Sequence, residues 1–247
     1  MPMPRWHSMR MRADNSRTMR GLEMANERRC SVRLLVFAAS LREGSLNEQL
    51  ASLAAKVAEE KGATVERASM EKFECPSYDT DVELEVGIPP GAQALHDKLG
   101  AADGFIISSP EYNASVSGVL KNAIDWASRF RPQPFNGKQA FVIAASPSMS
   151  GGKSGLWALR QPLEHLGARV YPDMFALAQA HKAFDASGRI ADSKLQQWFE
   201  STIECFIDLV EASKHYPDLK KQWVEFLGER PEEETTRVEL GATAAAV

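Results

Sequence analysis

The sequence VRLLVFAASLREGSLN, residues 32–47, joins an apolar run to a polar turn. Its first half, residues 32–39, contains one polar side chain, Arg33, which is typical of a strand buried on both faces of a sheet. Apolar residues then recur at helical spacing from Leu46 to Val57, and Gly62 ends the predicted helix. A buried strand followed directly by a helix is the repeating unit of parallel α/β folds.

The same alternation continues to residue 212. Apolar runs predict further strands at residues 63–70, 104–108, 138–145 and 168–177. Helical spacing predicts helices at residues 92–102, 120–127, 154–166 and 192–212. A polar, Pro-rich connection is predicted at residues 71–90. This order predicts a doubly wound α/β fold, a three-layer sandwich in which helices cover both faces of a parallel sheet.

The two ends of the chain lack this pattern. Residues 1–31 are rich in Arg and Met without apolar periodicity, and they are predicted to be a disordered N-terminal extension. Residues 213–247 are predicted to add a helical piece around Trp223–Leu227 and a disordered tail. One domain, residues 32–212, is therefore expected between two extensions. An alternative is that the Arg-rich N-terminal segment is a targeting sequence.

Composition narrows the possible functions. No run of 18 apolar residues occurs, so no membrane-spanning helix is predicted. The formal net charge is −4, and the first 33 residues hold eight arginines against three acids. The other 214 residues therefore have a net charge of −9, which repels nucleic-acid phosphates. Three dispersed cysteines form no zinc motif and favour a reducing, cytoplasmic location.

Polar loops follow three of the predicted strands at their carboxyl ends, where sheets of this kind bind ligands. After the first strand come Ser40, Arg42, Ser45 and Asn47, which lead into a helix. Hydroxyl, guanidinium and amide donors at a helix N-terminus suit a phosphate monoester. The alternative needs no ligand, because Ser45 and Glu48 match the capping box S-x-x-E.

The loop after the third strand contains Pro110, Glu111, Tyr112 and Asn113. A fixed backbone beside an aromatic and two polar side chains suits a planar heteroaromatic ring. The alternative is a plain turn in which Asn113 caps the next helix.

The loop after the fourth strand is rich in small residues, including Ser146, Ser148, Ser150 and Gly151. It is expected to wrap a ring or a sugar chain, or else to be a mobile linker. Side chains typical of catalysis or metal binding form no known pattern, so no catalytic residue and no metal ligand is assigned. Trp126, Trp157 and Trp198 are predicted core residues, and His96, His165 and His181 are predicted surface or packing residues.

Residues 32–180 resemble the NADPH-dependent FMN reductases, a flavodoxin-like group that includes quinone, chromate and azo-dye reductases. The matching motifs are SLR at residues 40–42 with Ser45 and Asn47, SPEYN at residues 109–113, and residues 115–126. The resemblance implies a five-stranded parallel sheet of order 2-1-3-4-5 that holds FMN non-covalently. It places the FMN phosphate on Ser40, Arg42, Ser45 and Asn47, the flavin ring on Pro110, Glu111, Tyr112 and Asn113, and the ring edge or ribityl chain on Ser146, Ser148, Ser150 and Gly151.

The resemblance also implies an activity. Hydride would pass from NADPH, or from NADH, to the flavin and then to a small-molecule acceptor: a quinone, an azo compound, a metal oxyanion or free flavin. Family members are usually homodimers or homotetramers. Two departures occur, because Ala39 replaces a usual Gly and Ser117 replaces a common Pro, which predicts a looser turn. A flavodoxin-type electron carrier and a non-redox, phosphate-binding regulatory module remain open alternatives.

Overall fold

The computed structural model of the chain describes residues 31–214. The predicted extensions, including the helical piece around Trp223–Leu227, lie outside this range except for Ser31, Ser213 and Lys214. Their boundaries therefore stay predictions.

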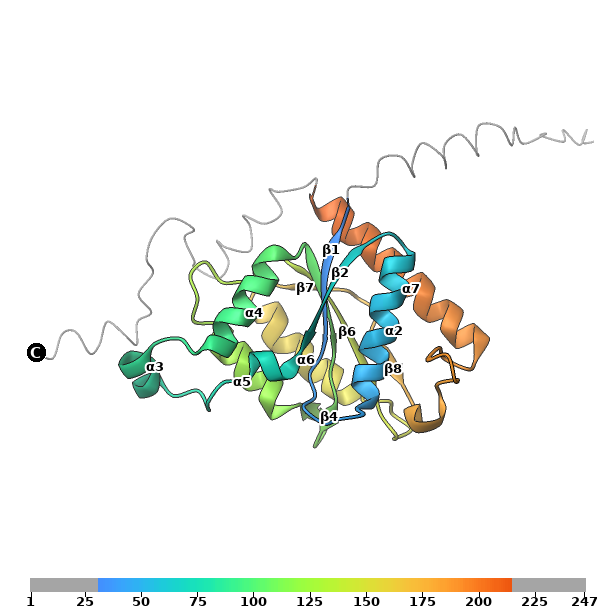
Figure 1. Cartoon of the computed structure of the whole chain (residues 1–247), viewed down its shortest axis with the longest axis horizontal. Coiled ribbons are helices and arrows are strands. Elements are labelled where there is room, and N and C mark those ends of the chain that lie inside the picture. The colour runs from blue at the N-terminus through green and yellow to red at the C-terminus, as the bar shows by residue number, and fades with distance from the viewer. Residues whose placement is uncertain (1–30, 215–247) are drawn as a thin grey trace, which may run out of the picture. The chain divides into compact units, whose positions relative to one another are not determined.

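A parallel sheet forms the centre of the molecule (Figure 1). Its strands are β1 (Arg33–Ala38), β2 (Thr64–Ser69), β3 (Gly104–Ser108), β6 (Gln139–Ala145), β7 (Arg169–Val170) and β8 (Phe175–Leu177). They pair in the order β2-β1-β3-β6-β7, and β8 pairs with β6 beyond the end of β7. All these pairs are parallel, so the predicted fold class is confirmed.

The fifth position of the sheet holds two short strands where the sequence predicts one. The interruption spans residues 171–174, between β7 and β8, and includes Pro172, which cannot donate to a strand ladder. Arg160 donates to the carbonyl oxygens of Val170 at 3.2 Å and Tyr171 at 2.7 Å. The guanidinium thus satisfies backbone oxygens that the break removes from the ladder.

Helices cover both faces of the sheet, as the strand–helix alternation predicts. The helices α2 (Leu46–Glu60) and α7 (Ser193–Lys214) pack on one face, where they meet Leu34 and Val36 of β1. The other face is covered by α4 (Pro90–Ala101), α5 (Gly118–Ala127) and α6 (Lys153–His165), which meet Leu35 and Phe37. Figure 1 shows the two helical layers on either side of the strands. None of the helices within residues 31–214 combines the length and apolar composition that a bilayer crossing needs.

The connection after β2 is more ordered than its polar, Pro-rich sequence predicts. It contains a 3-10 helix, η1 (Met70–Phe73), and a short helix, α3 (Thr80–Val86), that projects from the body in Figure 1. Asn122 accepts from the Tyr78 amide at 2.8 Å, and the Trp126 indole donates to the Pro76 carbonyl at 2.8 Å. Side chains of α5 therefore order this connection, an interaction that local sequence does not reveal.

Only one of the three predicted core tryptophans is buried. Trp126 has no exposed surface, whereas Trp157 and Trp198 are 58% and 46% exposed, so the prediction was wrong for these two. The buried stripe of α6 contains Leu156 and Leu159, and Trp157 lies one position off it. A single position rotates a side chain by about 100° around a helix, enough to move it from core to solvent.

An ionic contact closes the amino edge of the sheet. The Asp103 carboxylate accepts from the Arg33 amide at 2.8 Å and from Lys214 at 3.0 Å. Burial alone would raise the pKa of this carboxyl, but these donors hold the pKa below its usual range. The contact joins the start of β1 to the end of α7.

Candidate functional site

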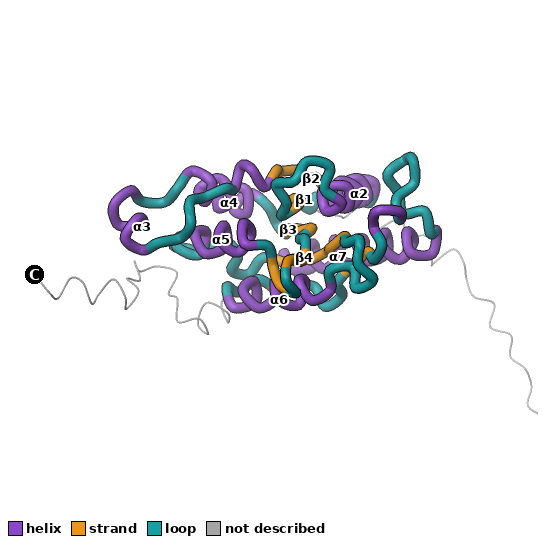
Figure 2. Tube along the Cα trace, turned by 90° about the horizontal axis from the view of Figure 1, so that it is seen from below, coloured by secondary structure: helices purple, strands orange, loops and turns teal. Residues whose placement is uncertain are grey.

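The carboxyl edge of the sheet contains a crevice beside the ends of β1, β3 and β6. Figure 2 looks onto this edge. The neighbours β2 and β3 lie on opposite sides of β1, so the crossovers diverge there and leave the opening that ligands use in doubly wound folds. A pocket of about 360 Å³ occupies it. Its lining comes from three loops: Ser40, Arg42, Ser45, Leu46 and Asn47; Pro110, Glu111 and Tyr112; and Ala145, Ser146 and Pro147.

Eight of the twelve predicted cofactor-binding residues line this pocket. The other four, Asn113, Ser148, Ser150 and Gly151, belong to the same loops but do not line it. The pocket also includes Leu46, Ala145 and Pro147, which the sequence analysis missed because apolar residues beside a polar loop give no chemical signal.

The loop after β1 groups donors at the start of α2. The Ser40 hydroxyl accepts from the Arg42 amide at 3.3 Å, which makes a tight turn. The Arg42 side chain is exposed, and its guanidinium donates to the Gly44 carbonyl at 3.3 Å. The first turn of a helix also leaves backbone N–H groups without intrahelical acceptors. This donor set fits a phosphate group.

The predicted capping box forms only in part. Ser45 is the N-cap of α2, and its hydroxyl accepts from the Asn47 amide at 3.2 Å. Glu48 does not complete the box, because its carboxylate pairs with Arg67 from β2. The capping alternative was therefore right about Ser45 and wrong about Glu48.

Asn47 is a buried connector between strand ends. Its side-chain amide donates to the Ala145 carbonyl and accepts from the Ala145 amide, both at 3.0 Å. Its oxygen also accepts from the Ser108 hydroxyl at 3.1 Å. The Asn47 amide thus makes the two hydrogen bonds to the end of β6 that a backbone peptide group of a neighbouring strand would make. The side chain shapes the pocket floor, and one N–H remains for a ligand.

The loop after β3 is a small antiparallel hairpin of β4 (Glu111–Tyr112) and β5 (Ser115–Val116). Its turn residues, Asn113 and Ala114, have φ values of 51° and 59°, as a type I′ turn requires. Asn113 therefore does not cap the next helix, and that alternative was wrong. The helix α5 begins at Gly118, five residues later.

Ser117 pins the hairpin to the loop after β1. Its hydroxyl is buried and donates to the Ala39 carbonyl at 3.2 Å. The hydrogen bond constrains the turn at the position where proline is common in the family, and the looser turn predicted there stays a prediction.

The Glu111 carboxylate acts as a cap. The helix α6 starts after Gly152, which offers no side chain, and Glu111 accepts from the Gly155 amide in the first turn at 2.8 Å. A Cβ added to Gly155 would lie 3.0 Å from the Glu111 Cβ, so the missing side chain permits this contact. A carboxylate at a helix N-terminus is electrostatically favourable. Glu111 thus ties the hairpin to α6.

Hydrogen bonds connect the loop after β6 internally and to β8. The Ser146 hydroxyl contacts the Ser148 hydroxyl at 3.0 Å, and Ser148 contacts Ser150 at the same distance. The Ser146 amide donates to the Leu177 carbonyl at 3.1 Å, which anchors the loop to β8. Gly151 is buried against Ala176 of β8.

The three histidines predicted to be surface or packing residues do not line this pocket. His96 stacks on Phe130 with ring centroids 4.2 Å apart, and His165 and His181 are exposed. Within residues 31–214, no three His, Cys, Asp or Glu side chains are grouped so that they could hold a metal ion.

Comparison with known proteins identifies the family to which this chain belongs. A flavodoxin-like sheet with a phosphate-type loop beside an aromatic hairpin defines a mononucleotide-binding α/β protein. Residues 32–182 match the family model of the NADPH-dependent FMN reductases, and the chain belongs to that family. It is an oxidoreductase with FMN as cofactor and NAD(P)H as electron donor, as the sequence analysis predicts.

Individual relatives agree with this family. An NAD(P)H-dependent FMN reductase of Pseudomonas aeruginosa is 35% identical over 175 residues, which are 70% of this chain and 92% of the relative. A quinone reductase of Escherichia coli is 34% identical over 178 residues, 71% of this chain and 93% of that one. The solved structure of FerB, a flavoenzyme NAD(P)H:(acceptor) oxidoreductase from Paracoccus denitrificans, matches with 31% identity and a TM-score of 0.64. That match covers 74% of this chain and 98% of FerB.

Proposed function

We propose that the crevice at the carboxyl edge holds FMN and that the enzyme reduces quinones, and by the same route azo compounds, metal oxyanions or free flavin. The observation that supports this proposal is the gathering of eight predicted residues around one pocket. Quinones are proposed first because two relatives that this chain matches over 93% and 83% of their own length are named as a quinone reductase and a probable NADPH:quinone oxidoreductase. Family membership favours this oxidoreductase over the electron carrier and the regulatory module.

The residues present fit FMN. Ser40, Arg42 and the N-cap Ser45 supply hydroxyl and guanidinium donors at one end of the pocket, the set that a phosphate needs. Pro110 and Tyr112 supply apolar and aromatic surface for a ring on the hairpin side. We place the ribityl chain or the ring edge along Ser146, with Ser148 and Ser150 supporting it through their hydroxyl contacts.

Bound FMN supplies the redox chemistry, since it accepts hydride from NAD(P)H and passes electrons to the acceptor. The protein's residues bind and orient. Tyr112 is 53% exposed at the pocket mouth, where donor and acceptor must enter. Glu111 serves α6 as a cap, so we assign no acid or base to it. We therefore propose that this reductase relies on positioning rather than on a catalytic side chain.

Arg42→Ala tests the phosphate assignment. We expect the FMN dissociation constant to rise about 10- to 100-fold, because a charge-assisted hydrogen bond contributes about 1.5–3 kcal/mol. Titration of the apoprotein, followed by the visible flavin spectrum, measures the change. Arg33→Ala is the matched control, because Arg33 begins β1, at the opposite end from the loop that contains Arg42. Its guanidinium lies 3.5 Å from the Asp103 carboxylate. An unchanged FMN affinity in Arg42→Ala would reject the assignment, and a wild-type protein that takes up no FMN would reject the proposed function.

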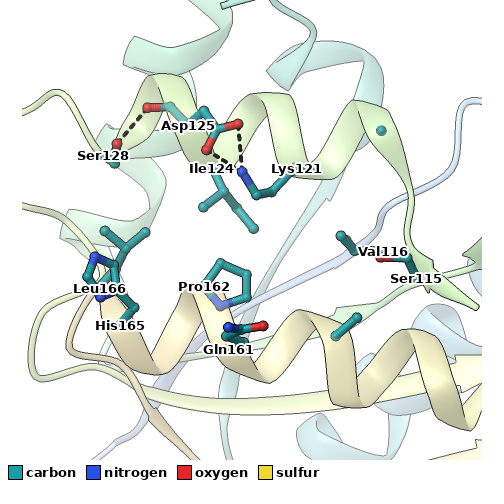
Figure 3. Close-up of a pocket in the computed structure, with 12 residues that line it drawn as sticks. Ser115, Val116, Lys121, Ile124, Asp125, Ser128, Gln161, Pro162, His165 and Leu166 are labelled. Carbon is teal, nitrogen blue, oxygen red and sulfur yellow. Dashed lines mark hydrogen bonds and ion pairs between the residues drawn. The ribbon is translucent and has the colours of Figure 1, made fainter.

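A groove between α5 and α6 supports the proposed homodimer or homotetramer (Figure 3). Its volume is about 800 Å³, and Ile124 and Pro162 face each other across it. One end of the groove is formed by Val116 of β5, the strand that pairs with β4 beside the FMN pocket. We propose that a second copy of the chain covers this face, which would place the subunit boundary next to the flavin.

Trp157→Glu tests this surface. Trp157 is 58% exposed on α6, the helix that forms one wall of the groove. A buried charge would disfavour association, so we expect light scattering to report a smaller assembly at micromolar concentration. Trp198→Glu is the control, because Trp198 is similarly exposed on α7, which covers the other face of the sheet. Wild-type mass for Trp157→Glu, or a monomeric wild type, would contradict the proposal.

The other expectations stay proposals. We propose that residues 1–31 and 213–247 extend an FMN domain at residues 32–212. Two of the three cysteines, Cys75 and Cys205, are free thiols in the described chain, which supports the proposed cytoplasmic location.

A further inference from the structure

The helix α7 has apolar side chains on a side that the sheet does not cover. It ends at Lys214, where the described chain also ends (Figure 1). Its inner side packs on the sheet, since the Phe206 ring centroid lies 5.6 Å from that of Phe141 in β6. A second row of apolar residues, here called the outer stripe, contains Trp198, Cys205, Leu209 and Ala212. Successive members are 7, 4 and 3 residues apart, which places them on one side of the helix.

The outer stripe leaves apolar surface in contact with solvent. Trp198 is 46% exposed and Leu209 is 38% exposed, and Cys205 and Ala212 are exposed as well. A surface helix usually has one apolar side, and a helix that is apolar on more sides is usually covered there too. The outer stripe is therefore an apolar surface that residues 31–214 leave open.

The sequence after α7 contains a matching apolar pattern. Pro217 disfavours continuation of α7, and Asp218 and Gly228 are typical of the positions just before and just after a helix. The sequence thus predicts a helix at residues 219–227, which lie outside the described range. Its apolar residues recur at i, i+4, i+7 and i+8, and they are Leu219, Trp223, Phe226 and Leu227. So short a helix is not stable alone in water, and it needs a surface for its apolar side.

The outer stripe lies within reach of this segment. Only residues 215–218 separate the segment from α7, and connections of this length are common between antiparallel helices. At about 1.5 Å per residue, a helix at residues 219–227 is about 13 Å long, and the outer stripe measures about 10 Å from Ala212 to Cys205. We propose that residues 219–227 fold back antiparallel to α7 and cover the outer stripe from Ala212 to Cys205. Trp198 lies about 10 Å beyond Cys205, at the uncovered end.

The short connection favours this segment over a second copy of the chain as the cover. A group tethered by a few residues has an effective concentration in the millimolar range, far above the micromolar concentration of free protein. The helix α7 also lies on the opposite face of the sheet from α5 and α6, which form the groove assigned to a second copy. The docking is thus independent of the FMN site and of the proposed homodimer.

Alkylation of Cys205 by iodoacetamide tests the docking in the full chain loaded with FMN. Cys205 is a free and exposed thiol in the described chain, so a helix on the outer stripe should shield it from the reagent. Peptide mass spectrometry measures the rate at Cys205 in wild type and in the double variant Trp223→Ser/Phe226→Ser. We expect the double variant to react about tenfold faster, because it loses the two largest apolar contacts of the segment. Cys75, whose carbonyl accepts from Asn122 of α5, should react equally in both proteins and is the internal reference.

Lys221→Ser/Glu225→Ser is the matched control, because helical spacing places both residues on the polar side of the predicted helix. It should leave the rate at Cys205 unchanged. Equal rates in wild type and in Trp223→Ser/Phe226→Ser would overturn the inference, and so would an equal acceleration in the control. The wild-type rate should not depend on protein concentration. A rate that falls as the concentration rises would assign the outer stripe to a second copy and would also overturn the inference.

Discussion

Asn47→Ala should lower the free energy of unfolding by about 3 to 5 kcal/mol, the largest effect expected of any substitution at the site. The variant leaves the Ala145 amide, the Ala145 carbonyl and the Ser108 hydroxyl without their buried partner. Each unsatisfied buried polar group costs about 1–3 kcal/mol. Urea unfolding at equilibrium measures the loss, which should appear as a lower midpoint at an unchanged slope.

The control for this prediction is Gln49→Ala, two residues along the same helix. Gln49 is exposed, so its removal should change stability by less than about 0.5 kcal/mol. If Asn47→Ala were as stable as Gln49→Ala, water would have to satisfy the strand ends, and the amide would not be the connector described above. Because Asn47 also forms the pocket floor, the FMN affinity of the folded variant should fall as well.

Gly151→Ala should destabilise the protein by about 2 to 4 kcal/mol. Gly151 has a φ of 66°, and a Cβ there would lie 2.8 Å from both the carbon and the oxygen of the Ala176 carbonyl. Left-handed backbone costs a side-chain-bearing residue about 1–2 kcal/mol, and overpacking against a fixed strand adds about 1–3 kcal/mol. Thermal unfolding of the FMN-free protein measures the effect without a contribution from ligand binding.

Gly188→Ala separates the two contributions. Gly188 has a similar φ of 78°, but an added Cβ would meet no atom within 4 Å. It should therefore show only the backbone strain, about 1–2 kcal/mol. Equal destabilisation by both substitutions would mean that the loop moves away from β8 without cost, which would contradict the fixed position of the pocket wall.

The order of strands and helices could be predicted because burial leaves a periodic trace in local sequence. Leu34 and Val36 face one helical layer and Leu35 and Phe37 the other, so β1 reads as a continuous apolar run. The same reasoning failed where order depends on distant partners. The connection containing α3 is polar, and contacts from Asn122 and Trp126 order it.

The candidate site, like the fold, could be predicted from the sequence only in part. The three polar loops could be assigned to one edge because parallel strands place their carboxyl ends together. The roles of individual polar residues could not, because each depends on a partner far away in the chain. Asn47 bonds Ala145, 98 residues away, Ser117 bonds Ala39, 78 residues away, and Glu111 bonds Gly155, 44 residues away.

Local chemistry is therefore sufficient for the class of the fold and for grouping the polar loops at one edge, since apolar periodicity and loop composition are properties of neighbouring residues. The family was predicted from a resemblance in the motifs at residues 40–47 and 109–126. Which polar groups hydrogen-bond within the protein and so hold the pocket together was decided by tertiary packing. A hydrogen bond is directional and short, so its partner depends on strand register and on the position of each helix against the sheet. No stretch of local sequence contains that information.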